Sequence, residues 1–329
     1  MVPAIPDNVT GVGQGQPDDA AVRLSGRAGP HPDLDTFPLS DGTGLAVLDT
    51  GSPTARATAV LVHGWTQDHT SWDDVTAELS PTMRVLAYDC RGHGWSDAGP
   101  AGEGTIEKFA DDLAEVISGL VPSGRVVLAG HSLGGPVLMA FAERHRDLLR
   151  DRVDGVAFVA TSAAGIGRDL FGFHRRFTAV LLLARPLVTA IQKGSRRSIN
   201  FHFPGLLAQV LRLGLYGPGA ATKHNRTRTA AQVARSHPAT TGQLVDEMVR
   251  HDRIARLSDL AGTRTVILIG TKDGLTPIAH SRAIAAELPE AELVVYPKAG
   301  HMLPHERAAE VAAQIAALAA PAAQKENAG

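Results

Sequence analysis

One serine of the chain lies in a segment that is typical of a nucleophilic turn. Ser132 stands in GHSLGG, with the apolar run RVVLAG before it and a run of helical spacing after it. Glycines around a serine at a strand-to-helix junction allow the strand and the helix to pack closely around a sharp turn. The turn exposes the hydroxyl at a helix N-terminus, where the Leu133 N–H can donate to an oxyanion. We therefore predict that Ser132 is a nucleophile rather than only a helix cap.

A serine nucleophile needs a base, and the base needs an acid to orient it. Asp273 follows the apolar run VILIG, and His301 follows the apolar run ELVVY a short loop later. Both are expected just beyond the carboxyl ends of strands, where open α/β sheets build their sites. We predict that His301 takes the proton of Ser132 and that Asp273 orients His301. His305, one helical turn later, is expected on the surface of the last helix.

A second oxyanion donor is expected from the loop after an earlier strand, in AVLVHGWTQD. The Trp65 N–H is placed to donate there together with the Leu133 N–H. His63 precedes the nucleophile in the chain, so we expect it to stabilise this loop by a hydrogen bond. We expect His93 to belong to a tight loop and Cys90 to be a small core residue.

Short apolar runs alternate with amphipathic runs along most of the chain. The runs expected to form strands are TGLAVLDT, ATAVLVH, MRVLAYD, RVVLAG, DGVAFVAT, RTVILIG and AELVVYP. The runs expected to form helices are HTSWDDVTAEL, TIEKFADDLAEVISGL, LGGPVLMAFAERHRDLL, TPIAHSRAIAAEL and HERAAEVAAQIAAL. Several strand runs are apolar almost throughout, which is typical of strands buried on both faces of a parallel sheet. The alternation predicts an α/β fold with one mostly parallel sheet flanked by helices.

The alternation stops between residues 164 and 254, where helical patterns and loops occur without a convincing strand. We therefore predict a core in two parts, residues 34–163 and 255–320, with a helical cap or lid inserted at 164–254. Residues 1–33 and 321–329 have no periodic apolar pattern and are expected to be disordered tails.

The predicted cap has an unusual composition. It holds Phe171, Phe173 and Phe177, which we expect to roof a substrate pocket above Ser132. Between Arg168 and Arg235 there are twelve Lys or Arg residues and one acid, which leaves 20 basic and 33 acidic residues elsewhere. A basic, apolar cap could meet an anionic membrane surface or an acidic acyl carrier. The alternative is a solvated basic surface without a partner.

Composition excludes several classes of protein. The chain has 329 residues, of which 44% are hydrophobic, and this is enough for the core of one large domain. A net charge of −2 argues against nucleic-acid binding, and a single cysteine excludes an intramolecular disulfide. The longest apolar stretch, residues 177–191, is interrupted by Arg185 and Pro186 and is too short to span a bilayer. Since no secretory signal is visible, a cytoplasmic location is expected.

The motifs HGW, YDCRGHGWSD, GHSLGG, GTKDGLTP and KAGHMLPHE, in this order, resemble the α/β-hydrolase superfamily. The resemblance covers roughly residues 36–163 and 255–320, and the predicted cap matches no motif. Within the superfamily the HG-W loop resembles the esterase, haloperoxidase-like and epoxide-hydrolase branches more than lipases with HGGG. Epoxide hydrolases and haloalkane dehalogenases carry Asp where this chain has Ser132, which argues for acyl transfer to water.

The resemblance implies a serine hydrolase that cleaves a carboxylic ester, esterase- or lipase-like, without a metal or a cofactor. The apolar cap favours a small-molecule ester with a hydrophobic acyl group. A thioesterase acting on acyl-CoA or acyl carrier protein is the first alternative, because the basic cap could bind phosphates or an acidic carrier. Perhydrolysis, as in haloperoxidase-like enzymes, and C–C bond hydrolysis use the same triad and stay open. A non-catalytic binding protein on this fold is disfavoured by the complete triad.

Overall fold

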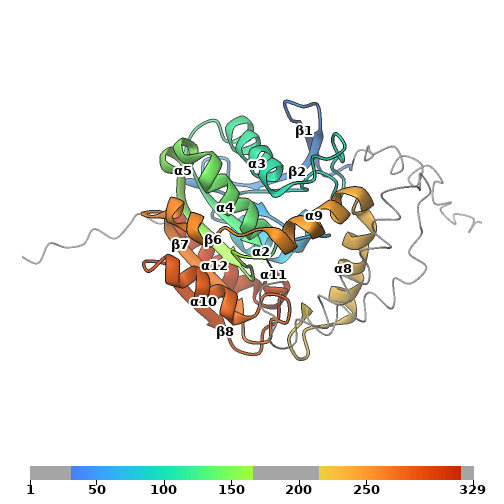
Figure 1. Cartoon of the computed structure of the whole chain (residues 1–329). Coiled ribbons are helices and arrows are strands. Elements are labelled where there is room, and N and C mark those ends of the chain that lie inside the picture. Colours follow the sequence, from blue (N-terminus) through green and yellow to red (C-terminus); the bar gives the residue numbers. More distant parts are fainter. Residues whose placement is uncertain (1–30, 166–214, 320–329) are drawn as a thin grey trace, which may run out of the picture.

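The protein is built on one eight-stranded sheet in the order β1-β2-β4-β3-β5-β6-β7-β8 (Figure 1). The computed structural model describes residues 31–165 and 215–319. The strands are β1 (Asp35–Pro38), β2 (Gly44–Gly51), β3 (Ala57–Val62), β4 (Arg84–Tyr88), β5 (Arg125–His131), β6 (Val153–Val159), β7 (Arg264–Gly270) and β8 (Glu292–Tyr296). Strand β2 pairs antiparallel with β1 and with β4, and all other neighbours are parallel. The carboxyl ends of β3 to β8 therefore meet at one edge of the sheet.

The central strands are apolar because helices cover both faces of the sheet. All six residues of β3 are buried, and its five apolar residues divide by alternation between two hydrophobic clusters. One cluster includes helices α3 (Ile106–Leu120), α4 (Gly134–Arg144) and α10 (Ile278–Glu287). The other includes α2 (Asp73–Leu79) and α12 (Ala308–Ala319). Packing on both faces holds the strands in place, so the loops at the carboxyl edge begin from fixed positions.

All seven strands expected from the sequence are present, and the α/β prediction is confirmed. The eighth strand, β1, was not expected, because its four residues DTFP carry no run of apolar residues. The helix expected over 133–149 is divided at His145, whose backbone leaves the helical region between α4 and α5 (Arg146–Arg152). The remaining short segments are the 3-10 helices η1 (His69–Trp72) and η2 (Ile254–Leu260), and helix α11 (Leu303–Glu306).

The connection from β6 to β7 contains helices α8 (Lys223–Arg235) and α9 (Pro238–Arg250). In Figure 1 both helices lie on the right of the view, with α9 nearer the centre of the molecule and α8 farther out. Phe171, Phe173 and Phe177 lie outside the described residues, as do the two predicted tails for most of their length. Of the helices in the described ranges, none has the length and apolar character needed to cross a bilayer.

Candidate active site

Ser132 lies on a strained turn between β5 and α4. Its φ of 52° falls in the left-handed region, which non-glycine residues rarely adopt. Three hydrogen bonds hold the turn: Ser132 N–H donates to the Val159 carbonyl at 3.0 Å, and the Ser132 carbonyl accepts from Gly135 N–H at 3.0 Å and from the Thr161 hydroxyl at 2.6 Å. The neighbouring strand β6 thus supports the conformation that the sequence pattern predicts.

Two glycines of the pattern are required by close backbone contacts. A Cβ on Gly130 would lie 2.5 Å from the Gly134 carbonyl oxygen, and a Cβ on Gly134 would lie 2.4 Å from the Val62 carbonyl oxygen. No real Cβ tolerates such distances, so the strand, the turn and the adjacent strand β3 can meet only where side chains are missing.

Asp273 and His301 come together at the ends of β7 and β8. His301 Nδ1 lies 2.9 Å from Asp273 Oδ2, and both side chains are almost completely buried. The other carboxylate oxygen of Asp273 accepts from the Leu275 and Thr276 N–H groups, each at 2.8 Å, and the Thr276 hydroxyl donates to Oδ2 at 2.7 Å. The turn after β7 therefore fixes the carboxylate, which in turn orients the imidazole with Nε2 directed away from the acid.

The segment of His301 packs against the segment of Ser132. His131, the residue before the serine, places Nε2 at 2.9 Å from the His301 carbonyl oxygen, and the two rings are 4.9 Å apart. Among the described residues the Ser132 hydroxyl makes no hydrogen bond, so its link to His301 Nε2 stays a prediction. Catalytic contacts of this kind are often loose without substrate.

The loop after β3 borders the serine as the sequence predicts. A Cβ on Gly64 would lie 3.1 Å from Ser132 Cβ, so the Gly64–Trp65 peptide lies next to Ser132. Neither the Trp65 N–H nor the Leu133 N–H donates to any described residue, which leaves both available to an oxyanion. The Trp65 indole N–H donates to the Thr241 carbonyl of α9 at 2.9 Å.

The structure adds two residues that sequence reasoning missed. Thr276 binds Asp273 and lies 3.3 Å from His301 Nδ1 through its hydroxyl. Gln67 is buried between the Gly64 N–H, the His131 ring and the Met302 sulfur. A threonine before a proline and a polar residue in a loop are too common for the sequence to single them out.

The other histidines near the site are structural. His63 Nε2 accepts from the Cys90 N–H at 2.9 Å while Nδ1 donates to the Gly64 carbonyl, and burial lowers the pKa of His63 to about 4. This confirms the expected role in stabilising the loop. Cys90 is a buried core residue, as expected, and His93 lies in the expected tight loop, between Gly92 and Gly94, which both have positive φ.

The expectation that His305 lies on the surface of the last helix is wrong. It belongs to α11, and its Nδ1 shares a 2.9 Å hydrogen bond with the Tyr216 hydroxyl. Burial lowers the pKa of His305 to about 3. The reason is that the segment before α8 packs over α11, which periodicity alone does not reveal.

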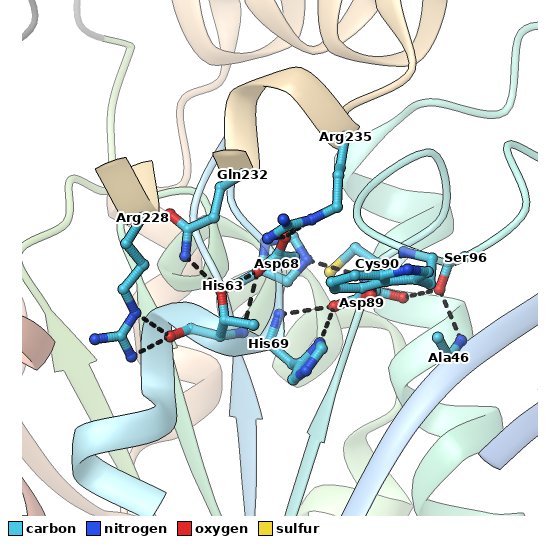
Figure 2. Close-up of polar contacts among 12 residues, drawn as sticks. Ala46, His63, Asp68, His69, Asp89, Cys90, Ser96, Arg228, Gln232 and Arg235 are labelled. Carbon is cyan, nitrogen blue, oxygen red and sulfur yellow. Dashed lines mark hydrogen bonds and ion pairs between the residues drawn. The ribbon is translucent and has the colours of Figure 1, made fainter. Parts of the chain in front are cut away.

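Asp68, His69 and Asp89 place their ligand atoms close enough together for a metal ion. Figure 2 shows, however, that these atoms already have protein partners. Asp89 Oδ1 is bonded by the main chain and the ring of His69, each at 2.7 Å, and Asp68 Oδ2 is bonded by Arg235 at 2.8 Å. A guanidinium on one of the oxygens disfavours a cation, and we assign the cluster a structural role.

The described part of the basic insert is bound in part to the acidic core. Arg228 and Arg235 point from α8 toward the loop 68–70 (Figure 2). Arg235 forms an ion pair with Asp68, and its guanidinium lies 4.3 Å from the centre of the Trp95 ring. Arg228 donates to the Thr70 carbonyl and forms an ion pair with Asp74 at 2.9 Å. Some of the charge separation seen in the sequence is therefore neutralised within the molecule.

The chain is similar in sequence and in fold to several known proteins. An uncharacterized protein of Mycobacterium tuberculosis is 30% identical over 260 residues, which are 75% of this chain and 70% of that protein. The pimeloyl-[acyl-carrier protein] methyl ester esterase of Chromobacterium violaceum is 27% identical over 250 residues, 75% of this chain and 89% of the other. A thermophilic esterase from Thermogutta terrifontis superposes with a TM-score of 0.69 at 26% identity, covering 86% of this chain and 97% of that chain.

A family model described as the alpha/beta hydrolase fold matches residues 59–308, which include the turn of Ser132 and the loops of Asp273 and His301. This match covers most of the chain, and the sheet order described above agrees with it. The chain belongs to the α/β-hydrolase family.

Proposed function

We propose that the protein is a serine hydrolase that cleaves a carboxylic ester through Ser132, His301 and Asp273. The observation that carries the proposal is the buried 2.9 Å pair of His301 and Asp273, set on loops that pack against the strained turn of Ser132. The second support is that the Trp65 and Leu133 N–H groups border this turn without a described acceptor.

The arrangement supports a two-step mechanism. Ser132 Oγ attacks the ester carbonyl carbon while His301 Nε2 accepts the hydroxyl proton, and the Trp65 and Leu133 N–H groups stabilise the oxyanion. The tetrahedral intermediate collapses as His301 gives the proton to the leaving alcohol, which leaves an acyl-serine. Water, deprotonated by the same histidine, then attacks the acyl-serine; the bond to Ser132 Oγ breaks as His301 returns the proton to this oxygen, and the carboxylic acid is released.

An oxygen ester is favoured by the relatives. Two of the similar proteins reported above are named as esterases, the thermophilic esterase from Thermogutta terrifontis and the pimeloyl-[acyl-carrier protein] methyl ester esterase. A hydrophobic acyl group is expected from Phe171, Phe173 and Phe177, and this part of the proposal rests on the sequence alone.

The test is a substrate panel. Purified protein is assayed on p-nitrophenyl esters of graded acyl length beside acyl-CoAs of the same lengths, with Ser132→Ala as control. We expect ester hydrolysis that is lost in the variant, together with covalent labelling of Ser132 by a fluorophosphonate. Labelling that persists in Ser132→Ala would move the nucleophile elsewhere.

A second candidate is a thioester or ester presented on an anionic partner, such as acyl-CoA, acyl carrier protein or an anionic lipid surface. The basic composition of residues 168–235 favours it, although Arg228 and Arg235 already have core partners. The test replaces Arg175, Arg176, Arg196 and Arg197 by Glu. A rise in KM for acyl-CoA alone supports a thioesterase, loss of binding to anionic vesicles alone supports an interfacial enzyme, and no change in either rejects the partner.

A further inference from the structure

Gln67 lies where three parts of the site converge. It follows the Gly64–Trp65 peptide in the loop after β3, and its side chain is buried with 6% of its surface exposed. The polar atoms of a buried amide are normally hydrogen-bonded, because an unsatisfied polar group in the interior costs about 1–3 kcal/mol. The partners of Gln67 are therefore informative about why the loop carries a glutamine.

The amide of Gln67 has contacts on both of its ends. Oε1 accepts from the Gly64 N–H at 3.0 Å and lies 3.0 Å from His131 Nδ1, while Nε2 donates to the Met302 sulfur at 3.2 Å. The Gln67 main-chain N–H also donates to the Gly64 carbonyl at 3.1 Å. Since Gly64 N–H can only donate, it fixes which end of the amide carries the oxygen.

Each of these partners is adjacent in sequence to one proposed catalytic group. Gly64 precedes Trp65, the oxyanion donor; His131 precedes Ser132; and Met302 follows His301. One side chain thus connects the oxyanion loop, the nucleophile turn and the loop of the base. The neutral His131 ring has one N–H, so it can donate to only one of two acceptors, Gln67 Oε1 or the His301 carbonyl. The bond from the Gly64 N–H to Gln67 Oε1 is present whichever ring nitrogen of His131 carries the proton.

We propose that Gln67 is a positioning residue, whose amide holds the Trp65 N–H at the distance from Ser132 and His301 that oxyanion stabilisation requires. The inference rests on the proposed function, because it assigns Trp65 the oxyanion role. Donors of an oxyanion hole act over a narrow range of distances, and a displacement of about 1 Å can lower a rate by about 100-fold. An apolar side chain of equal size would fill the same space without fixing the peptide.

The test compares two variants of nearly equal size. Gln67→Met fills the space but has no strong acceptor for the Gly64 N–H, whereas Gln67→Glu keeps an oxygen at that position. On a neutral p-nitrophenyl ester we expect Gln67→Met to lower kcat by about 10- to 100-fold with KM within about 3-fold of the original. We expect Gln67→Glu to recover most of that loss.

A matched control separates positioning from stability. Gln232 of α8 is also a buried glutamine, and its Nε2 donates to the Thr70 hydroxyl at 2.9 Å rather than to the site. Gln232→Met should leave kcat unchanged, and the change in its melting temperature gives the effect on stability of replacing a buried glutamine away from the site. Equal losses of kcat in both variants would overturn the proposal.

A second measurement does not depend on hydrolysis. Amide hydrogen exchange at Gly64 should be slow in the original protein and in Gln67→Glu, and faster in Gln67→Met. If the original protein hydrolyses no ester but Gly64 exchange responds as expected, the proposed function fails and the anchoring of the loop stands. If Gly64 exchange and kcat are both unchanged in Gln67→Met, the positioning role is wrong. Should that variant not fold, Gln67→Asn replaces it, because its amide is one methylene too short to reach Gly64.

Discussion

Within residues 31–165 and 215–319, two buried Asp–His pairs have nearly the same geometry. His301 Nδ1 lies 2.9 Å from Asp273, and His69 Nδ1 lies 2.7 Å from Asp89. All four side chains are almost completely buried. By distance and burial alone, either pair could orient a catalytic base.

The two pairs differ in how the acid is held and in what surrounds the histidine. Two main-chain N–H groups of its own turn bind Asp273 Oδ1, so Oδ2 is left to bind His301, 28 positions along the chain. Asp89 instead accepts hydrogen bonds from the main-chain N–H and the ring of His69 and from the main-chain N–H of Trp95. It therefore holds the loop of His69 against the loop of Trp95.

The neighbours of the two histidines confirm this contrast. The ring beside His301 is His131, which precedes Ser132, whereas the ring beside His69 is Trp95, over which Arg235 lies. An Asp–His pair is therefore a candidate for catalysis only when the histidine lies next to a nucleophile, and the same pair elsewhere fixes a loop.

The largest effect should come from removing the charge of each acid in turn. Asp273→Asn should lower kcat/KM for an ester by about 10⁴-fold, because the histidine loses its tautomer and its compensating charge. Asp89→Asn should change kcat/KM by less than about 10-fold and act mainly on stability, since it leaves the His69 N–H groups poorly paired. Ser132→Ala gives the background rate, and losses of similar size in both Asn variants would contradict the distinction.

The next effect concerns the buried partner of Arg235. Arg235→Met should lower the free energy of unfolding by about 3 kcal/mol, because it leaves the fully buried Asp68 carboxylate without a counter-charge. Denaturant unfolding measures this. Adding Asp68→Asn to Arg235→Met should recover part of the loss, and additive losses would show that the two side chains are not coupled.

Stability should also depend on pH in a defined direction. Burial lowers the pKa of His63 to about 4 and that of His93 to about 3, whereas an unfolded histidine titrates near 6.5. The stabilisation is therefore fully present above pH 6.5 and is lost as the pH falls toward 4 and 3, by about 1.4 kcal/mol per pH unit for each group. For His69 burial alone would lower the pKa, but Asp89 raises it, so this group acts in the opposite direction.

Unfolding free energies measured between pH 7 and 4 would test this expectation. His63→Gln removes one titrating group. The slope of the unfolding free energy against pH should therefore decrease by up to the contribution of one proton, about 1.4 kcal/mol per pH unit. A decline that is unchanged in this variant would show that His63 is not neutral in the folded protein.

The smallest effect should come from Trp65→Phe. The variant loses the indole hydrogen bond to the Thr241 carbonyl but keeps the main-chain N–H that we assign to the oxyanion hole. We expect a loss of about 1 kcal/mol in unfolding free energy and little change in kcat. A fall in kcat comparable to that of Gln67→Met would mean that α9, rather than Gln67, sets the position of this loop.

Much of the site could be predicted from the sequence because its chemistry depends on local rules. A strand, a turn with small residues and a helix place Ser132, and the short loops after two strands place Asp273 and His301 at the same edge of the sheet. The order of these elements in a parallel sheet then brings distant residues together without further information. For the same reason His63 was correctly expected to support its own loop.

Only the tertiary structure decided which polar residues connect these elements. Gln67 reaches Met302 over 235 positions of the chain, and His131 reaches the His301 carbonyl over 170. The sequence likewise did not show that His305 meets Tyr216, or that Arg235 neutralises Asp68. Such contacts depend on the spacing of whole layers, so many residues at these positions are compatible with the local pattern. The local sequence pattern determines on which element and at which end a side chain lies. The packing of the layers determines which other side chains it contacts.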